Sequence, residues 1–278
     1  MYSNNELKEI ARKIRHGIIE AVYHAKSGHP GGSLSIADIL AVLYFNNMNI
    51  DPNNPKKVDR DRFILSKGHC SPALYSTLAN RGYFDENNLK TFRKIDSFLQ
   101  GHPDMNKVPG VDMTSGSLGQ GLSVANGMAL AAKLDNLDYR VYVMMGDGEI
   151  EEGQIWEAAM TSSFYKLNNV IGFVDYNGLQ IDGKLAEVKT PEPIKDKFIA
   201  FGWKVIEING HDFDEIQKAI DKAKKSTDKP TLILANTIKG KGISFMENQV
   251  GWHGKAPSDE EYNNAIRELM EVCHEQSY

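Results

Sequence analysis

Apolar residues recur at helical spacing in the first part of the chain. Ile10, Ile14, Ile18 and Val22 follow one another every four residues, which places them on one side of a helix. We expect this helix to end near the glycine-rich turn at residues 28–32. A second helix is predicted over 36–45, and further helical patterns cover residues 118–133, 155–165 and 213–225.

Five short apolar runs are interpreted as buried strands. They cover residues 63–65, 141–145, 170–174, 203–208 and 231–235. Strands that are apolar on both faces are typical of a parallel sheet covered by helices on both sides. Helical patterns lie between most of the runs, which favours the same architecture. The sequence therefore predicts a single α/β domain over residues 1–278, with a parallel sheet and helices on both of its faces.

One more helix is predicted at the end of the chain, over residues 258–275. Ser258 and Glu261 have the spacing of a capping box. Apolar residues, Cys273 being the last, then recur at helical spacing at positions 262, 265, 266, 269, 270 and 273. This last helix is also a candidate for packing on a partner.

Composition and charge exclude several classes of protein. The 278 residues are 41% hydrophobic and 25% charged, with 32 basic and 37 acidic residues for a net charge of −5, so no nucleic-acid-binding surface is indicated. Two widely separated cysteines, Cys70 and Cys273, suit a reducing compartment. The sequence shows neither a signal peptide nor an apolar run long enough for a membrane span. We therefore expect a cytoplasmic protein without a membrane partner.

The strongest local signal follows the run at 141–145. Gly146, Asp147 and Gly148 lead into a helical pattern, and Asn177 follows the next run, thirty residues after Asp147. This distance is about one βαβ unit, and ligands of parallel sheets collect at the carboxyl ends of strands. If the two strands are neighbours, the carboxylate and the amide offer hard oxygen ligands for Mg²⁺ or Ca²⁺, to be completed by phosphate or water. The N–H of Gly148 and the helix start suit the same phosphate. Either dipeptide alone favours a simple turn, but their joint placement favours a ligand site.

Histidines give a second signal, because six of the eight stand next to a glycine. His29, His69, His102 and His253 lie in the segments SGHPGG, LSKGHCSPA, QGHPD and WHGKAP, where glycine allows a close approach to a ligand. Each alone is more simply structural. Four together suit the binding and deprotonation of a polyhydroxylated substrate, since imidazole exchanges protons near neutral pH. His211, in NGHDF, is left open between turn stabilisation and function.

The segment TSGSLGQG at 114–121 opens a helical pattern. It offers backbone groups to a planar ring or an anion, although its glycines are equally compatible with close helix packing. The sequence contains no GxxxxGK[ST] loop, GxGxxG fingerprint or HExxH motif, so the chemistries tied to those motifs are not indicated.

Taken in order, these motifs resemble the thiamin-diphosphate-binding amino-terminal domain of transketolases, from about residue 8 to residue 262. The resemblance implies the thiamin diphosphate-binding fold and a divalent metal, Mg²⁺ or alternatively Ca²⁺ or Mn²⁺, held by Asp147, Asn177 and the backbone oxygen of Leu179. The implied cofactor contacts are His69, Gly116, Leu118, Gly148, Glu152, Asn177 and Ile181. The implied catalytic residues are His29, His69, His102, His253 and Glu152, of which Glu152 would join a carboxylate network across a subunit interface. Ser117 departs from the family pattern, in which proline is common at this position.

Transketolases carry on a second domain the glutamate that protonates the aminopyrimidine and the arginines that grip sugar phosphate. Only one domain is predicted in this sequence. The resemblance therefore implies the amino-terminal subunit of a split transketolase, with a carboxy-terminal partner subunit of comparable size in a heterotetramer. Such an enzyme transfers a two-carbon ketol unit from a ketose phosphate to an aldose phosphate.

Several alternatives stay open from the sequence. Within the thiamin enzymes they are a 1-deoxyxylulose-5-phosphate synthase or a 2-oxoacid dehydrogenase component, although SGHPGG and the Glu152-Gly153 pair favour the transketolase form. A specialised transketolase-like enzyme for unusual sugars is a further possibility. From other classes, a metal-dependent hydrolase is an alternative, but this sequence lacks the paired HxxxH or HxH ligands that such a site would use. A regulatory subunit without catalysis is also open.

Overall fold

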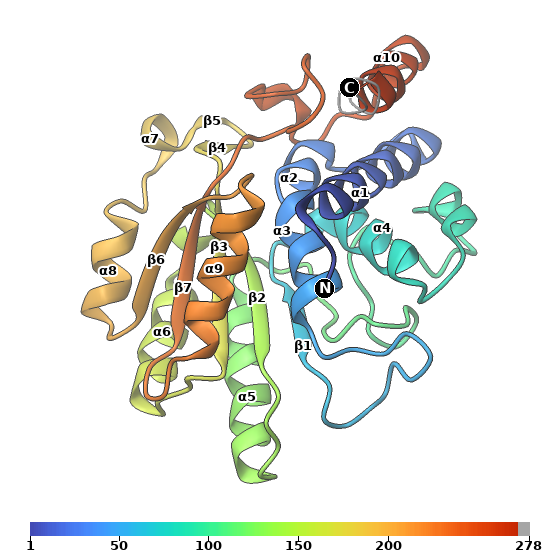
Figure 1. Ribbon diagram of the computed structural model, residues 1–278. Helices are drawn as coiled ribbons and strands as arrows, with labels where there is room; N and C mark the ends of the chain where they lie inside the picture. Colours follow the sequence, from blue (N-terminus) through green and yellow to red (C-terminus); the bar gives the residue numbers. More distant parts are fainter. Residues whose placement is uncertain (272–278) are drawn as a thin grey trace.

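A five-stranded parallel sheet forms the centre of the computed structural model, which describes residues 1–271 (Figure 1). In spatial order the strands are β1 (Arg62–Leu65), β2 (Val141–Gly146), β3 (Val170–Tyr176), β7 (Thr231–Asn236) and β6 (Lys204–Asn209). All four pairings are parallel. The central strands β2 and β3 are buried along nearly their whole length, as strands covered on both faces must be. The five predicted strands are confirmed.

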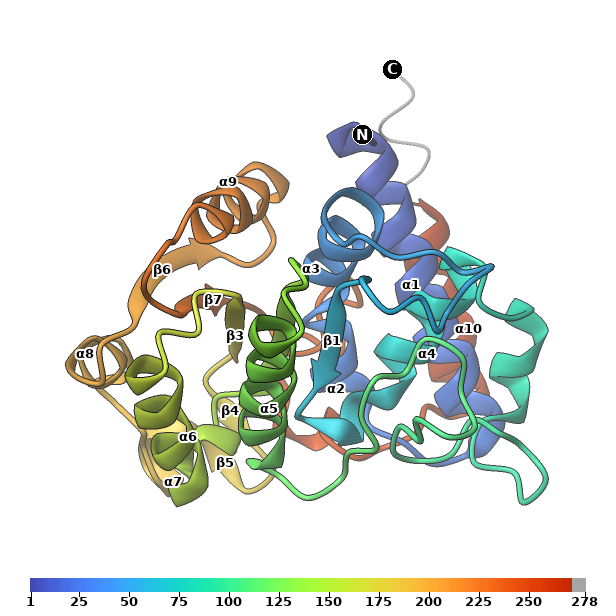
Figure 2. The same ribbon diagram turned by 90° about the horizontal axis from the view of Figure 1, so that it is seen from below.

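Helices cover both faces of this sheet, as predicted. Tyr142 and Met144 of β2 enter one core, which is formed with α1 (Asn4–Ala25), α3 (Ala37–Val42), α4 (Ser71–Arg81) and α9 (Phe213–Lys224). Val143 and Met145 enter the opposite core, formed with α5 (Gln120–Leu134), α6 (Gly153–Phe164) and α8 (Ile194–Ala200). Figure 2 shows α3 and α9 on one side of the sheet and α5, α6 and α8 on the other.

The predicted first helix, α1, forms on the apolar stripe that the sequence shows. Ile14, Ile18 and Val22 of α1 are fully buried, and the helix begins with a capping box in which Ser3 and Glu6 bond each other's backbone N–H. The helix predicted over 36–45 is α3, followed by one π-type turn over Leu43–Asn47.

The elements that the pattern did not predict are short or buried all round. They are α2 (Pro30–Leu34), α4, α7 (Leu185–Val188), α8, the two-stranded pair β4 (Leu179–Gln180) and β5 (Gly183–Lys184), and the 3₁₀ turns over Gly68–Cys70, Glu86–Thr91, Glu149–Glu151 and Val250–Trp252. The eleven-residue α4 is buried from Ser71 to Ala79, so it has no polar face to create a helical period.

The last described helix, α10 (Asp259–Glu271), packs on α1. Ser258 and Glu261 bond each other's backbone N–H, which confirms the predicted capping box. The ring of Tyr262 stacks on Tyr23 of α1 at 3.9 Å between centroids. The predicted extension to residue 275, with Cys273, lies outside the described residues. Among residues 1–271, no helix has the length and apolar character needed to cross a membrane.

Two helical glycines give a matched test of the packing of α1 against α4 and Leu89. A Cβ on Gly17 would stand 2.8 Å from Leu89 Cδ1 and still closer to the Ser76 hydroxyl, which donates to Ile14 O at 2.9 Å. A Cβ on Gly127 of α5 would meet no atom within 4 Å. We expect Gly17→Ala to lower the free energy of unfolding by about 1–3 kcal/mol through overpacking. Gly127→Ala should raise it by up to about 1 kcal/mol through helix propensity.

Urea unfolding of the two variants beside the parent chain measures both changes. A Gly17→Ala chain as stable as the parent would show that the contact between α1 and α4 is looser than described.

Candidate functional site

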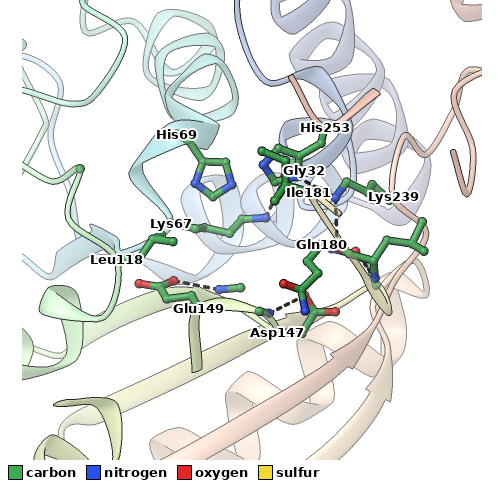
Figure 3. A pocket seen from close by; sticks show the side chains of 15 residues that line it. Gly32, Lys67, His69, Leu118, Asp147, Glu149, Gln180, Ile181, Lys239 and His253 are labelled. Atoms are coloured by element: carbon green, nitrogen blue, oxygen red, sulfur yellow. Dashed lines mark hydrogen bonds between the residues drawn. The ribbon is translucent and has the colours of Figure 1, made fainter. Parts of the chain in front are cut away.

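A cavity of about 320 Å³ opens at the carboxyl ends of β1, β2, β3 and β7 (Figure 3), where ligands of parallel sheets are expected. Its wall contains nine of the predicted site residues: His69, Gly116, Leu118, Asp147, Gly148, Asn177, Leu179, Ile181 and His253. The other wall residues are Gly32, Lys67, Gly146, Glu149, Gln180 and Lys239.

Asp147 and Asn177 lie at the same edge of the cavity because β2 and β3 are neighbours, with Gly146 opposite Asp175. Asp147 accepts the N–H groups of Gly148 at 2.8 Å and Gly178 at 2.7 Å. Asn177 donates through Nδ2 to Asp175 at 3.1 Å, and its Oδ1 accepts the Leu179 N–H at 3.1 Å. The two loops therefore hold a carboxylate and an amide at one edge of the cavity.

The electrostatics of Asp147 suit a bound cation. Burial, together with the nearby negative charge of Asp175, raises the pKa of Asp147 to about 6. One carboxylate, the Asn177 amide oxygen and the Leu179 carbonyl form a set of hard oxygen donors, which fits a divalent ion that completes its shell with phosphate or water. Residues 1–271 contain no group of three His, Cys, Asp or Glu side chains arranged to hold a metal, so this set depends on the amide and the carbonyl.

Two buried lysines give the cavity positive charge. Lys67 and Lys239 are each 2% exposed. Lys67 Nζ lies 2.5 Å from Asp175 Oδ2 and is neutralised by it. Lys239 Nζ donates to Leu179 O at 3.0 Å and lies 2.9 Å from His253 Nδ1, and within the described chain it has no carboxylate partner. Burial lowers the pKa of Lys239. Since a buried cation without a counter-ion is costly, the cavity fits an anionic ligand.

The predicted histidines gather on one side of the cavity. The ring centroids of His29, His69 and His253 are 5.2 to 5.5 Å apart. Burial and neighbouring positive groups lower the pKa of His29 and His69 to about 4 and that of His253 to about 3, so these rings are neutral at pH 7. His102 lies beside Gly116 of the cavity wall, since its ring is 3.4 Å from the position of a Cβ on that glycine. Burial also lowers the pKa of His102.

Three of the predicted positions lie outside the cavity wall. His29 and His102 do not line it, and Glu152 is an exposed residue at the start of α6, beside Gly119. His211 bonds Asp38 at 2.7 Å through Nδ1 and accepts the Ile238 N–H at 2.8 Å. His211 therefore ties two loops together, which favours the structural interpretation of this residue.

Sequence reasoning missed Lys67, Lys239 and Glu149. Lys67 comes two residues after β1 and Lys239 three residues after β7, so the rule that selected Asp147 and Asn177 applies to both lysines. Glu149 comes three residues after β2 and fits the same rule, although its contacts come from segments far apart in the sequence.

The neutral histidines predict how stability depends on pH. Their folded pKa values lie below the ordinary 6.5, so the unfolded chain binds more protons between pH 6.5 and about 4. Their contribution to stability is therefore complete above pH 6.5 and is lost as the pH falls through this window. We expect the urea midpoint to drop from pH 7 to pH 5, and to drop less in His69→Asn and His253→Asn. Equal slopes in all three proteins would contradict the neutral cluster.

Comparison with known proteins places these features in one family. The family model described as transketolase, thiamine diphosphate binding domain, matches residues 6–275. The chain is 48% identical to a 6-deoxy-6-sulfo-D-fructose transketolase subunit of Clostridium sp. (strain MSTE9), over 95% of this chain and 96% of that protein. It is 45% identical to an apulose-4-phosphate transketolase subunit of Phocaeicola vulgatus, over 94% of this chain and 92% of that protein.

Solved structures agree with the sequence comparison. The chain superposes on the transketolase of Campylobacter jejuni with a TM-score of 0.91 and 37% identity, over 97% of this chain and 43% of that one. By sequence, it also matches human transketolase at 42% identity, over 90% of this chain and 40% of that protein. The chain thus spans less than half the length of these transketolases but nearly the whole of the two subunits. We conclude that it belongs to the transketolase family, in which it corresponds to the amino-terminal, thiamine diphosphate-binding part.

Proposed function

We propose that this chain is the amino-terminal subunit of a two-chain transketolase that holds thiamin diphosphate and a divalent metal in the cavity at the strand ends. With a carboxy-terminal partner subunit it would transfer a two-carbon ketol unit from a ketose phosphate to an aldose phosphate. The observation that carries the proposal is the combination of an unpaired buried cation, Lys239, with the oxygen donors of Asp147 and Asn177 beside a cluster of neutral histidines. Relatives of the same length that are named as transketolase subunits support it.

Each part of the cavity suits a different part of the cofactor. Asp147, Asn177 and the Leu179 carbonyl would hold the metal, with Mg²⁺ preferred over Ca²⁺ or Mn²⁺. Lys239 and the Gly148 N–H would bind the diphosphate. The Leu179 carbonyl now accepts from Lys239 and the Gly148 N–H donates to Asp147, so both would exchange partners on loading. On the other side, Gly116, Leu118 and Ile181 would contact the organic rings, as would His69 and, at the subunit interface, Glu152.

The histidines would handle the substrate. Thiamin diphosphate, when bound, supplies the nucleophilic carbon and the electron sink for breaking a carbon–carbon bond. A lysine ammonium has only donors, so Lys239 fixes the proton of neutral His253 on Nε2. Nε2–H is then available as a hydrogen-bond donor, while the neutral rings of His29, His69 and His102 can accept protons from sugar hydroxyls. We assign His253 and His29 to the oxygen that develops charge.

The names of the relatives indicate the class of substrate. They mention a sulfonated sugar and a sugar phosphate, both of which carry an anionic group, and this favours a sugar phosphate or a specialised analogue here. We further propose a heterotetramer acting in the cytoplasm on sugar phosphates, as in the pentose phosphate pathway. The choice of donor and acceptor would be set largely by the partner.

Cofactor titration tests the binding half of the proposal. We expect thiamin diphosphate to bind only with Mg²⁺, and this metal-dependent binding to be lost in Asp147→Ala and Asn177→Ala. Lys239→Met should weaken thiamin diphosphate much more than thiamin, because only the former carries the diphosphate. Lys229→Met, an exposed exchange at the opposite end of β7, is the matched control. Calorimetry on the chain, alone and with its partner, measures these affinities. Binding that ignores both metal and Asp147 would rule out the assigned site.

Reconstitution tests the partner. We expect the purified chain to show no ketol transfer by itself, and activity to appear on adding the complementary subunit, which we would seek in the adjacent reading frame. Activity should saturate at a one-to-one ratio of the two chains. Full ketol-transfer activity of this chain alone would contradict the requirement for a partner.

A further inference from the structure

Glu149 is a buried acid in the cavity wall to which the proposed function gives no role. Its side chain is part of a residue only 3% exposed, and Figure 3 shows it between Leu118 and Asp147. One oxygen, Oε1, accepts the Gly119 N–H at 2.9 Å and the hydroxyl of Ser66. The other, Oε2, accepts the Gly146 N–H at 2.9 Å. Three donors therefore converge on one carboxylate.

The three donors belong to three segments that meet only in the folded chain. Ser66 follows β1, Gly119 precedes α5, and Gly146 is the last residue of β2. The network continues from Ser66, whose hydroxyl oxygen accepts the Gly121 N–H of α5 at 3.1 Å. A Cβ on Gly121 would collide with the Ser66 side chain. The contact between these segments thus has little room for adjustment.

Ser66 and Glu149 together replace a missing helix cap. The residue before α5 is Gly119, with φ +84° and no side chain to bond the free N–H groups of the first turn. The Ser66 hydroxyl accepts the Gly121 N–H of the first turn. The Glu149 carboxylate accepts the N–H of Gly119 itself and interacts favourably with the helix dipole. Because these two acceptors follow β1 and β2 and do not belong to the helix's own sequence, the start of α5 is tied to the positions of both segments.

We propose that Glu149 is a positioning residue that sets the distance between the two loops that grip opposite ends of thiamin diphosphate. This inference rests on the proposed function, in which Gly116 and Leu118 contact the rings while Asp147 and Gly148 serve the diphosphate and metal. Both loops end on the same carboxylate. A ligand that touches both loops depends on their separation, whereas a ligand that touches only the second does not.

This difference separates positioning from general stability. Inorganic pyrophosphate would use only the diphosphate side, where Asp147 has its own bond to Gly178. Thiamin diphosphate would span both sides. Loss of Glu149 should therefore weaken thiamin diphosphate selectively, while a merely destabilised fold would weaken both ligands alike.

Glu149→Gln is the sharpest variant because it keeps the shape of the side chain. A glutamine amide has one acceptor oxygen and one donor group, so either the Gly146 N–H or the pair from Ser66 and Gly119 must face an NH₂ group. Ser66→Ala removes one of the three bonds to Glu149, together with the bond to the Gly121 N–H, and is the second variant if Glu149→Gln folds poorly. Glu260→Gln, at an exposed position of α10, is the matched control.

The experiment measures the affinity of the full chain, with its partner subunit, for thiamin diphosphate and for inorganic pyrophosphate, both with Mg²⁺. We expect Glu149→Gln to weaken thiamin diphosphate about tenfold or more, the effect of losing a hydrogen bond to a charged group, and pyrophosphate less than about threefold. Ser66→Ala should show the same selectivity to a smaller extent, and Glu260→Gln should change neither affinity. Equal losses for both ligands, or no loss, would overturn the proposal.

Amide hydrogen exchange without any ligand gives an independent readout. In Glu149→Gln we expect faster exchange at Gly119, Gly121 and Gly146 and unchanged exchange along β3. Unchanged exchange at the three glycines would overturn the positioning role even if no cofactor binds. If the parent chain instead fails to bind thiamin diphosphate while the exchange pattern changes as expected, the proposed function fails and the positioning of the two loops stands.

Discussion

The buried carboxylate of Asp175 is the interaction on which the architecture of the site depends. This residue is fully buried near the end of β3, and it receives donors from four segments. Ser35 bonds it at 2.7 Å, Lys67 at 2.5 Å and Asn177 at 3.1 Å, with Thr237 as the fourth. A buried charge is tolerated only when it is paired and its lone pairs are satisfied. The loops after β1, β3 and β7 are therefore fixed against one another before any ligand arrives.

This anchoring explains the distribution of charge in the cavity. Because Lys67 neutralises Asp175, the groups left for a ligand are the carboxylate of Asp147 and the ammonium of Lys239. The Asp147 carboxylate requires a cation as its counter-charge, and the Lys239 ammonium requires an anion. A complex of a divalent metal with a diphosphate satisfies both at once, whereas a bare metal ion or a bare anion satisfies only one. Burial, together with the neighbouring lysines, lowers the pKa of His69 and His253 and keeps these rings neutral, as the proton transfer proposed for them requires.

The sequence predicted those features that depend on local pattern. The strands follow from continuous apolar runs, and the meeting of Asp147 with Asn177 follows from consecutive strands of a parallel sheet. The insertion of β7 between β3 and β6 has no local signal, and neither does α4, whose burial on all sides removes the polar face. Lys239 and Glu149 escaped for a related reason. Both residues follow strand ends, but the groups that they contact come from distant segments, and no spacing along the chain records those contacts.

The exposure of the cavity rim argues that the cofactor site is incomplete in this chain. Leu118 is 37% exposed and Ile181 62% exposed, although both are expected against the rings of the cofactor. Chemistry that generates a reactive carbon nucleophile requires a site from which water is excluded, and apolar side chains this open to solvent do not exclude it. On the diphosphate side, by contrast, Asp147 is 3% exposed and Lys239 2% exposed. The part of the cavity that would face the cofactor rings must therefore be shielded from water by additional protein. The subunit-length relatives favour a second chain as the source of that protein.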